Sequence, residues 1–142
     1  LLKRLRERLD LTYIIITRNP HEIHVISDRV AVMYLGKVVE LAGTHALFTE
    51  PKHPYTEALM SAIPIPDPRL RDRREHIVLQ GEIPSPRNPP PGCPFHPRCR
   101  YAEQRCREEV PPLQPIGDSE HLSACFFPEQ VVGAVVTEPF EE

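Results

Sequence analysis

The sequence lacks several features on which common functions depend. Its 17 lysines and arginines are outnumbered by 20 aspartates and glutamates, so no basic excess indicates binding to nucleic acid. No run approaches the roughly 20 apolar residues that a membrane-spanning helix needs. The start, LLKRLRERLD, carries alternating charges and has no apolar signal-peptide core. Any association with a membrane is therefore expected to come through a partner protein.

A phosphate-binding loop is also missing. Such a loop needs the pattern G-x-x-x-x-G-K-[ST]. The Gly36-Lys37 pair has Ala31 at the position of the first glycine and Val38 in place of serine or threonine. The apolar run 12–17 has no acidic pair at its end to hold Mg²⁺ or water. The chain alone is therefore predicted neither to bind ATP tightly nor to hydrolyse it.

The first 63 residues have an α/β pattern. A leucine stripe over 1–9 predicts a helix, and the β-branched run 12–17 is typical of a strand buried on both faces of a parallel sheet. Because the helical pattern is already running at Leu1, we expect the sequence to continue upstream. A helix is predicted over 20–26, with Asn19 as its N-cap. A hairpin is predicted over 29–42, turning at Gly36-Lys37 with glycine first in the turn. Two further helices are predicted, a short one capped by Thr44 and one that begins at Pro54.

Prolines change the character of the rest of the chain. Of the 18 prolines, only Pro20, Pro51 and Pro54 fall in the first sixty residues. The predicted division is a charged, proline-rich linker over 64–75, a cysteine-bearing module over 76–128, and a tail over 129–142 without a clear partner. Inside the module the predictions are a strand at 76–80, neither helix nor central strand over the prolines of 84–97, and a short helix at 101–109.

Two stretches resemble a known family. YIIITRNPHEIHVISDRVAVMYLGKVVELAGT, beginning at Tyr13, is similar to the strand, switch loop, helix and hairpin near the end of ABC-transporter nucleotide-binding domains. THALFTEPKHPYTEALMSAIP, beginning at Thr44, is similar to the segment typical of the peptide-transporter branch, with HPYT at 53–56 as its signature. The resemblance implies that residues 1–63 are the C-terminal part of a P-loop ABC-type nucleotide-binding domain. The glycine-rich signature loop of that family is missing here.

Arg18 is the catalytic candidate that this resemblance implies. It stands where the family carries a switch-loop histidine that touches the γ-phosphate, and Asn19 follows where aspartate is usual. Arginine can pair with phosphate oxygens, but it lacks the neutral imidazole that holds phosphate and orients the attacking water. The alternative interpretation is a solvated residue at the end of a strand. His21 and His24 are spaced to share a metal, but a solvated helix face is preferred because no third ligand lies nearby.

The four cysteines, in the spacing C-x₅-C-x₆-C-x₁₈-C, all lie in the proline-rich part. Segments of about 40 residues rarely build a sufficient core without a staple, and structural zinc can contribute about 10–16 kcal/mol of folding free energy. The spacing matches neither a ferredoxin run nor a zinc finger with paired C-x₂-C. It leaves open an iron–sulfur cluster, a Cys₄ zinc site in which His96 can replace one thiol, and two disulfides or unpaired core cysteines; the cysteines in question are Cys93, Cys99, Cys106 and Cys125.

The family resemblance extends over this segment. GEIPSPRNPPPGCPFHPRCRYAEQRC, beginning at Gly81, and the later Ala124-Cys125 are similar to the C-terminal extension of oligopeptide/dipeptide transporter ATPases. Some members carry a [4Fe–4S] cluster on these four cysteines, so the resemblance implies the same ligands here, in a structural role. The stiff proline-rich loops over 84–97 suit either a docking surface or a plain spacer.

The function implied is part of the ATP-binding subunit of an ABC importer for peptides or related small solutes. ATP and Mg²⁺ would be cofactors only of the complete protein. The expected partners are transmembrane permease subunits, a second ATPase subunit and, indirectly, a solute-binding protein, at the cytoplasmic face of the cell membrane. The alternatives are a free-standing metal-binding interaction module without an ATPase role, and a redox sensor with a labile cluster.

Overall fold

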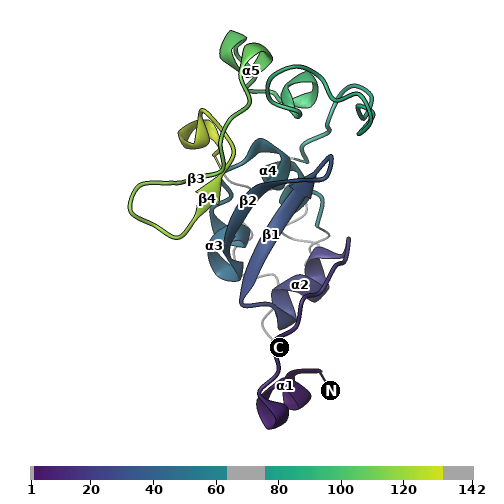
Figure 1. Ribbon diagram of the computed structural model, residues 1–142, viewed down its shortest axis with the longest axis vertical. Coiled ribbons are helices and arrows are strands. Elements are labelled where there is room, and N and C mark those ends of the chain that lie inside the picture. Colours follow the sequence, from purple (N-terminus) through teal and green to yellow (C-terminus); the bar gives the residue numbers. More distant parts are fainter. Residues whose placement is uncertain (1, 64–75, 133–142) are drawn as a thin grey trace.

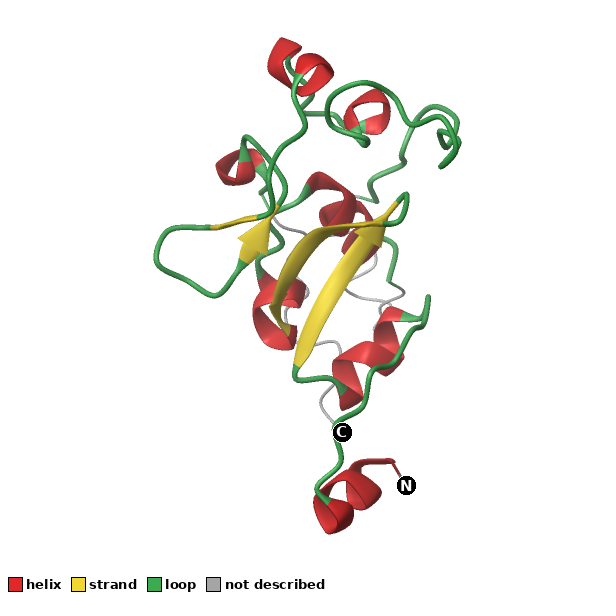
Figure 2. Cartoon of the chain, in the orientation of Figure 1, coloured by secondary structure: helices red, strands yellow, loops and turns green. Residues whose placement is uncertain are grey.

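The computed structural model describes residues 2–63 and 76–132. The hairpin of β1 and β2 forms the centre of the molecule, with α1 at one end and α5 at the other (Figure 1). Most of the described residues after α4 are loop (Figure 2). The elements are α1 (Leu2–Leu9), α2 (Pro20–Ile26), β1 (Arg29–Tyr34), β2 (Lys37–Gly43), α3 (Thr44–Thr49), α4 (Pro54–Ser61), the 3₁₀ turn η2 (His96–Arg98), α5 (Gln104–Glu108), β3 (Gln114–Pro115), β4 (Leu122–Ser123) and the 3₁₀ turn η3 (Pro128–Gln130).

The strands form one antiparallel sheet in the order β1-β2-β4-β3. The turn between β1 and β2 consists of Leu35 and Gly36, whose φ angles of 46° and 77° are both positive, as a type I′ turn requires. The predicted turn at Gly36-Lys37 was therefore wrong by one residue, since Lys37 already pairs with Tyr34. Glycine takes the second turn position, and Leu35 adopts the left-handed conformation.

A mixed core joins the hairpin to the helices and to the cysteine-bearing segment. Residues of β1 alternate between exposed and buried, so one face of the hairpin points inward. Phe48 of α3 and Met60 of α4 are buried against that face. Phe95, which follows Cys93 in the chain, is 1% exposed and lies with its ring 5.2 Å from that of Tyr34. The cysteine-bearing segment therefore supplies part of the same core.

Strand pairing links the two predicted regions as well. β4 pairs with β2 through Glu40 opposite Ser123 and Leu41 opposite Leu122. The segment after 76 therefore extends the sheet of the first region. The predicted linker at 64–75 lies outside the described residues. This shared sheet and core place the cysteines directly against the α/β part.

The segment 12–17 differs most from its prediction. It carries no strand in the structure, and Ile14 and Ile16 are 92% and 96% exposed. A strand buried on both faces needs neighbours on each side and helices above and below. The described residues place none of these around this segment. The apolar run is therefore left facing solvent here, although its composition is that of a core strand.

The remaining predictions are met in part. α2 and α4 begin at Pro20 and Pro54 as expected. Thr44 is not a cap, because Gly43 holds that position and the Thr44 hydroxyl donates to the Ser27 carbonyl at 2.6 Å. No strand forms at 76–80, and the helix expected at 101–109 shortens to α5. Of the predicted tail over 129–142, Val131 is 4% exposed, and residues 133–142 lie outside the described part.

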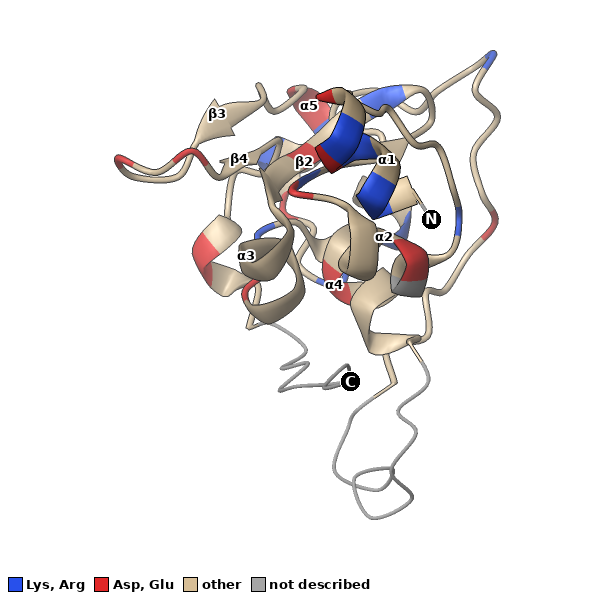
Figure 3. Ribbon diagram, turned by 90° about the horizontal axis from the view of Figure 1, so that it is seen from below, with Lys and Arg blue, Asp and Glu red and all other residues tan. Residues whose placement is uncertain are grey.

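Acidic and basic residues are interspersed along the ribbon rather than gathered in separate regions (Figure 3). This distribution agrees with the small net charge of −3. Among the described residues, none of the helices has the length and apolar character that crossing a bilayer demands.

Candidate metal centre

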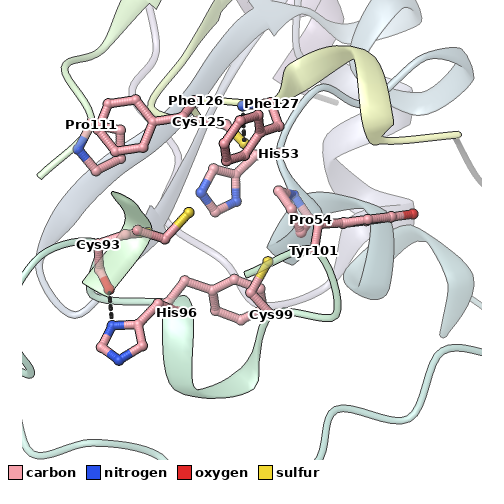
Figure 4. Close-up of a pocket in the computed structure, with 12 residues that line it drawn as sticks. His53, Pro54, Cys93, His96, Cys99, Tyr101, Pro111, Cys125, Phe126 and Phe127 are labelled. Atoms are coloured by element: carbon pink, nitrogen blue, oxygen red, sulfur yellow. Dashed lines mark hydrogen bonds between the residues drawn. The ribbon is translucent and has the colours of Figure 1, made fainter. Parts of the chain in front are cut away.

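All four cysteines line one pocket, although they come from different parts of the fold. Cys93 precedes η2 and Cys99 ends it, Cys106 belongs to α5, and Cys125 follows β4. The pocket encloses about 20 Å³, about the space of one water molecule. Figure 4 shows the side chains of Cys93, Cys99 and Cys125 around it, together with the rings of His53 and Phe127. The fold therefore brings together the cysteines that the sequence singled out.

Tight backbone contacts hold these cysteines near one another. The amide of Cys93 donates to the Cys106 carbonyl at 2.8 Å, which fixes the start of the loop against α5. Gly92 makes this approach possible: its φ is +68°, and a Cβ there would lie 2.5 Å from the same Cys106 carbonyl oxygen. The amide of His96 then donates to the Cys93 carbonyl at 3.0 Å, turning the chain toward Cys99. Only glycine fits this arrangement without displacing backbone.

The thiols lie in an environment that opposes ionisation. Burial raises the pKa of Cys93, and it raises the pKa of Cys99 to about 11 and that of Cys125 to about 12. Neighbouring cysteines add to the increase for all three. Metal-free, these thiols are therefore protonated at neutral pH, and a metal that binds them must displace their protons.

Backbone amides partly offset this effect. The amide of Phe127 donates to the sulfur of Cys125 at 3.4 Å. Backbone hydrogen bonds from Phe95 and Tyr101 likewise lower the pKa of Cys93 and Cys99. In each case the donor stands two residues after the cysteine. Such amides stabilise negative charge on sulfur and prepare it for a positively charged ligand.

The side chains of the described residues do not form a ready set of metal ligands. All four cysteines are free thiols, so the disulfide alternative is not what the structure has. Within residues 2–63 and 76–132, no three histidine, cysteine or acidic side chains form a group that could hold a metal ion as they stand. The predicted metal module is therefore not shown, and the choice between iron–sulfur and zinc stays a prediction.

The histidine at the thiols is not the one that the sequence suggested. The Nδ1 atom of His96 lies 2.9 Å from the Cys93 carbonyl oxygen, and its ring is turned away from the sulfurs (Figure 4). His53 occupies the pocket instead, 1% exposed, with its ring 5.7 Å from that of Phe95. Burial lowers the pKa of the His53 imidazole to about 3. The HPYT signature was the available signal, but it carried no indication of where the imidazole points.

A buried carboxylate anchors the cysteine segment to α4. Glu57, 2% exposed, accepts from Arg100 Nη2 at 2.8 Å and from the Tyr101 hydroxyl at 3.2 Å. These donors follow Cys99 directly in the chain. A buried acid of this kind needs charged or hydroxyl partners to offset its lost hydration. The contact therefore fixes the Cys99 loop relative to the helix that His53 caps.

The other candidate residues lie apart from this pocket. Arg18 is exposed in the loop before α2. The hydrogen bonds of that loop join Thr17 and Asn19 to Glu22. The ring of His24 packs edge-on against Phe48 at 4.9 Å, so it is not part of a fully solvated face; the side chain of His21 lies outside the described part. The role of Arg18 stays a prediction.

Comparison with known proteins shows which family the chain resembles. Residues 39–106 match the family model described as oligopeptide/dipeptide transporter, C-terminal region. The oligopeptide transport ATP-binding protein AppF of Bacillus subtilis is 48% identical over 125 residues, covering 88% of this chain and 38% of that protein. The putative oligopeptide transport ATP-binding protein YkfD of the same species is 52% identical over 116 residues, covering 82% and 35%. The probable peptide ABC transporter ATP-binding protein y4tS of Sinorhizobium fredii is 53% identical over 123 residues, covering 87% and 34%.

The chain thus spans only 34–38% of the length of these curated relatives. The family match begins in β2, runs through α3 and α4, and ends at Cys106, so it includes both the helix capped by His53 and three of the four cysteines. The chain belongs to the family of peptide ABC transporter ATP-binding proteins and corresponds to their C-terminal region.

Proposed function

We propose that this chain is the C-terminal part of the ATP-binding subunit of an ABC importer for peptides or related small solutes. The single observation that supports this most is the high identity, 46–53% in the relatives compared, to proteins whose names state peptide or oligopeptide transport or import. The complete subunit would bind ATP and Mg²⁺ upstream of this chain. It would work with transmembrane permease subunits, a second ATPase subunit and a solute-binding protein at the cytoplasmic face of the membrane.

The chain by itself is proposed to be inactive as an ATPase. The sequence contains no phosphate-binding loop, and phosphoryl transfer depends on that loop and its lysine to hold the phosphates. ATP hydrolysis by the purified 142-residue chain should therefore equal that of a buffer blank. Steady turnover that copurifies with the chain through several columns would contradict the proposal.

Reading the coding DNA upstream of Leu1 separates the two candidate functions. An in-frame phosphate-loop sequence supports the transporter subunit, and a start codon at this boundary supports the free-standing metal-binding module.

The four cysteines are further proposed to hold a [4Fe–4S] cluster. The residues suit such a cluster in kind and number, because each of its irons takes one cysteine thiolate. Three features support the fit: the cysteines line one pocket, amides two residues on donate to the sulfurs of three of them, and Gly92 fixes Cys93 against Cys106. When bound, the cluster would contribute folding free energy.

The cluster proposal is tested by metal analysis. The chain is purified without oxygen, reconstituted with ferrous iron and sulfide, and assayed for iron, zinc and acid-labile sulfide. We expect a brown protein with iron and sulfide in equal amounts and a variant with all four cysteines replaced by serine that retains neither. A colourless chain that takes up zinc, and no sulfide, would replace the cluster with a zinc site.

A further inference from the structure

His53 connects the helix α4 to the cysteine pocket. It is the N-cap of α4, and its Nδ1 atom accepts a hydrogen bond from the backbone N–H of Tyr55 at 3.1 Å. The same ring lines the pocket of the four cysteines. In Figure 4 it projects into this pocket from the side of Pro54, with its nitrogen-bearing edge toward the Cys93 sulfur. One imidazole therefore contacts two parts of the fold.

The hydrogen bond to Nδ1 determines where the proton of this imidazole lies. A backbone N–H only donates, so Nδ1 must present a lone pair to Tyr55. A neutral imidazole carries one proton, which is then on Nε2. A lone pair on Nδ1 also means that the ring is neutral, since an imidazolium carries a proton on both nitrogens. The atom opposite the cap is therefore a hydrogen-bond donor directed to the interior of the pocket.

The sulfurs are the acceptors suited to this donor. The pocket lining consists of the four cysteines together with proline, histidine and aromatic side chains. A thiolate or a cluster sulfide accepts a hydrogen bond from such a donor far better than a neutral thiol does. We propose that His53 donates its Nε2–H to a sulfur of the metal centre held by the cysteines, and thereby raises the reduction potential of the bound cluster. This inference rests on the cluster proposed above.

The direction of the effect follows from charge. Reduction adds an electron to a cluster that is already coordinated by four thiolates, and a hydrogen bond to sulfur stabilises the more negative state. Removing the donor therefore shifts the potential to a more negative value. His53 is a positioning and tuning residue and not a ligand, because Nε2 can bind metal only if its proton moves to Nδ1, where the Tyr55 N–H already points.

His96 provides the contrast. Its Nδ1 lies 2.9 Å from the carbonyl oxygen of Cys93, which only accepts, so Nδ1 carries the proton and Nε2 is the bare nitrogen. The two histidines of the pocket lining thus hold opposite tautomers, and only that of His53 presents an N–H to the sulfurs. This difference is measurable in the metal-free chain by the ring ¹⁵N shifts, without reference to any cluster.

Two variants separate the donor from the cap. His53→Ser keeps an oxygen that can cap α4 but is too short to reach the sulfurs. His53→Phe keeps the ring beside Phe95 and loses both nitrogens. His45→Ser removes an exposed imidazole on α3 and serves as the control. Each 142-residue chain is reconstituted anaerobically, and its potential is measured by an EPR-monitored titration alongside its thermal midpoint.

We expect a more negative reduction potential in both His53 variants and an unchanged potential in the His45→Ser control. His53→Phe should lose more thermal stability than His53→Ser, because it also removes the cap of α4. Potentials equal to that of the unaltered chain, in samples that contain the cluster, would overturn the role of His53 and leave the cluster standing. A potential shift in His53→Phe only would also overturn it, since the cap would then be the cause. If His53 in the metal-free chain carries its proton on Nδ1, the proposed role of His53 is overturned as well. An unaltered chain that takes up no iron and sulfide would overturn both proposals.

Discussion

Gly92 determines how closely the cysteine loop approaches α5. Its φ of +68° is a conformation in which a side chain costs about 1–2 kcal/mol. A Cβ would in addition lie 2.5 Å from the Cys106 carbonyl oxygen, where only backbone can give way. We predict that Gly92→Ala lowers the free energy of unfolding by about 3 kcal/mol and reduces iron–sulfur loading. Chemical denaturation and metal analysis measure the two effects.

Gly117 offers the matched control for this prediction. Its φ is +60°, close to that of Gly92, but nothing lies within 4 Å of the position of a Cβ. Gly117→Ala should therefore cost only the conformational part, about 1–2 kcal/mol, and leave metal loading intact. Equal costs for the two variants would mean that the close approach to Cys106 contributes nothing.

The burial of His53 predicts an acid sensitivity of the metal-free chain. Burial lowers the pKa of His53 from 6.5 to about 3. Between these values the unfolded chain binds a proton that the folded chain does not, so this contribution to stability is lost as pH falls from 6.5 toward 3. The His53 contribution to the free energy of unfolding changes by at most about 1.4 kcal/mol per pH unit. Thermal midpoints over this range should fall less steeply in His53→Phe; equal slopes would assign the acid sensitivity to other groups.

Single residues also mark the limit of what the sequence could predict. The cysteines could be singled out from their type and from their clustering in a proline-rich segment, whereas their assignment as four ligands came from the family resemblance. His53 was visible only as part of the HPYT signature. Its place beside the thiols depends on the ring orientation at the start of α4 and on the packing of Phe95, which joins residues far apart in the chain. No local pattern contains that information.

At the scale of elements, a buried carboxylate on β2 is hydrogen-bonded to the residue that precedes β4. Glu40 is fully buried, and its Oε1 accepts from His121 Nε2 and from the Lys52 amide, each at 2.6 Å. We predict that His121→Ala costs about 3 kcal/mol, because a buried carboxylate loses its side-chain donor. In a Glu40→Gln background the same change should cost less than about 1 kcal/mol. The double-mutant cycle is measured by chemical denaturation.

Strictly additive costs would contradict the prediction about this pair. Additivity would mean that His121 contributes through packing alone and that the carboxylate is satisfied without it. Glu40→Gln by itself keeps an acceptor for the Lys52 amide, so it is the milder of the two single changes. The comparison therefore tests the charge of Glu40 and not merely its presence.

Regular elements were predictable where their signals are local. The helix starts at Pro20 and Pro54 and the alternation along β1 can be read within a few residues. β3 and β4 are two residues long each. β4 joins the sheet by pairing with β2, far earlier in the chain, and β3 joins it only through β4. The segment 12–17 shows the converse: its composition predicts a buried strand, but strand formation needs partners that the described residues do not provide.

The whole molecule is held together at several places besides the thiols. The sequence alone suggested that metal is the main staple of a segment too poor in apolar residues to fold. The structure adds the buried ring of Phe95, the pairing of β4 with β2, and an ion pair between the buried carboxylate of Glu57 and Arg100. Burying a Phe side chain contributes about 1.5–3 kcal/mol. Metal removal is therefore expected to loosen the cysteine loops without unfolding the hairpin to which they are attached.

Replacing all four cysteines with serine tests this division at the scale of the whole chain. We predict that amides of β1 and β2 stay protected from hydrogen exchange, because their ladder of backbone hydrogen bonds involves no sulfur ligand. Amides between Cys93 and Cys106 should exchange faster than in the metal-loaded chain, since metal binding contributes folding free energy only where its ligands lie. Mass spectrometry of peptides from the two regions measures both. Loss of protection throughout would mean that the metal holds the entire fold, and the buried ring and strand pairing would then depend on it.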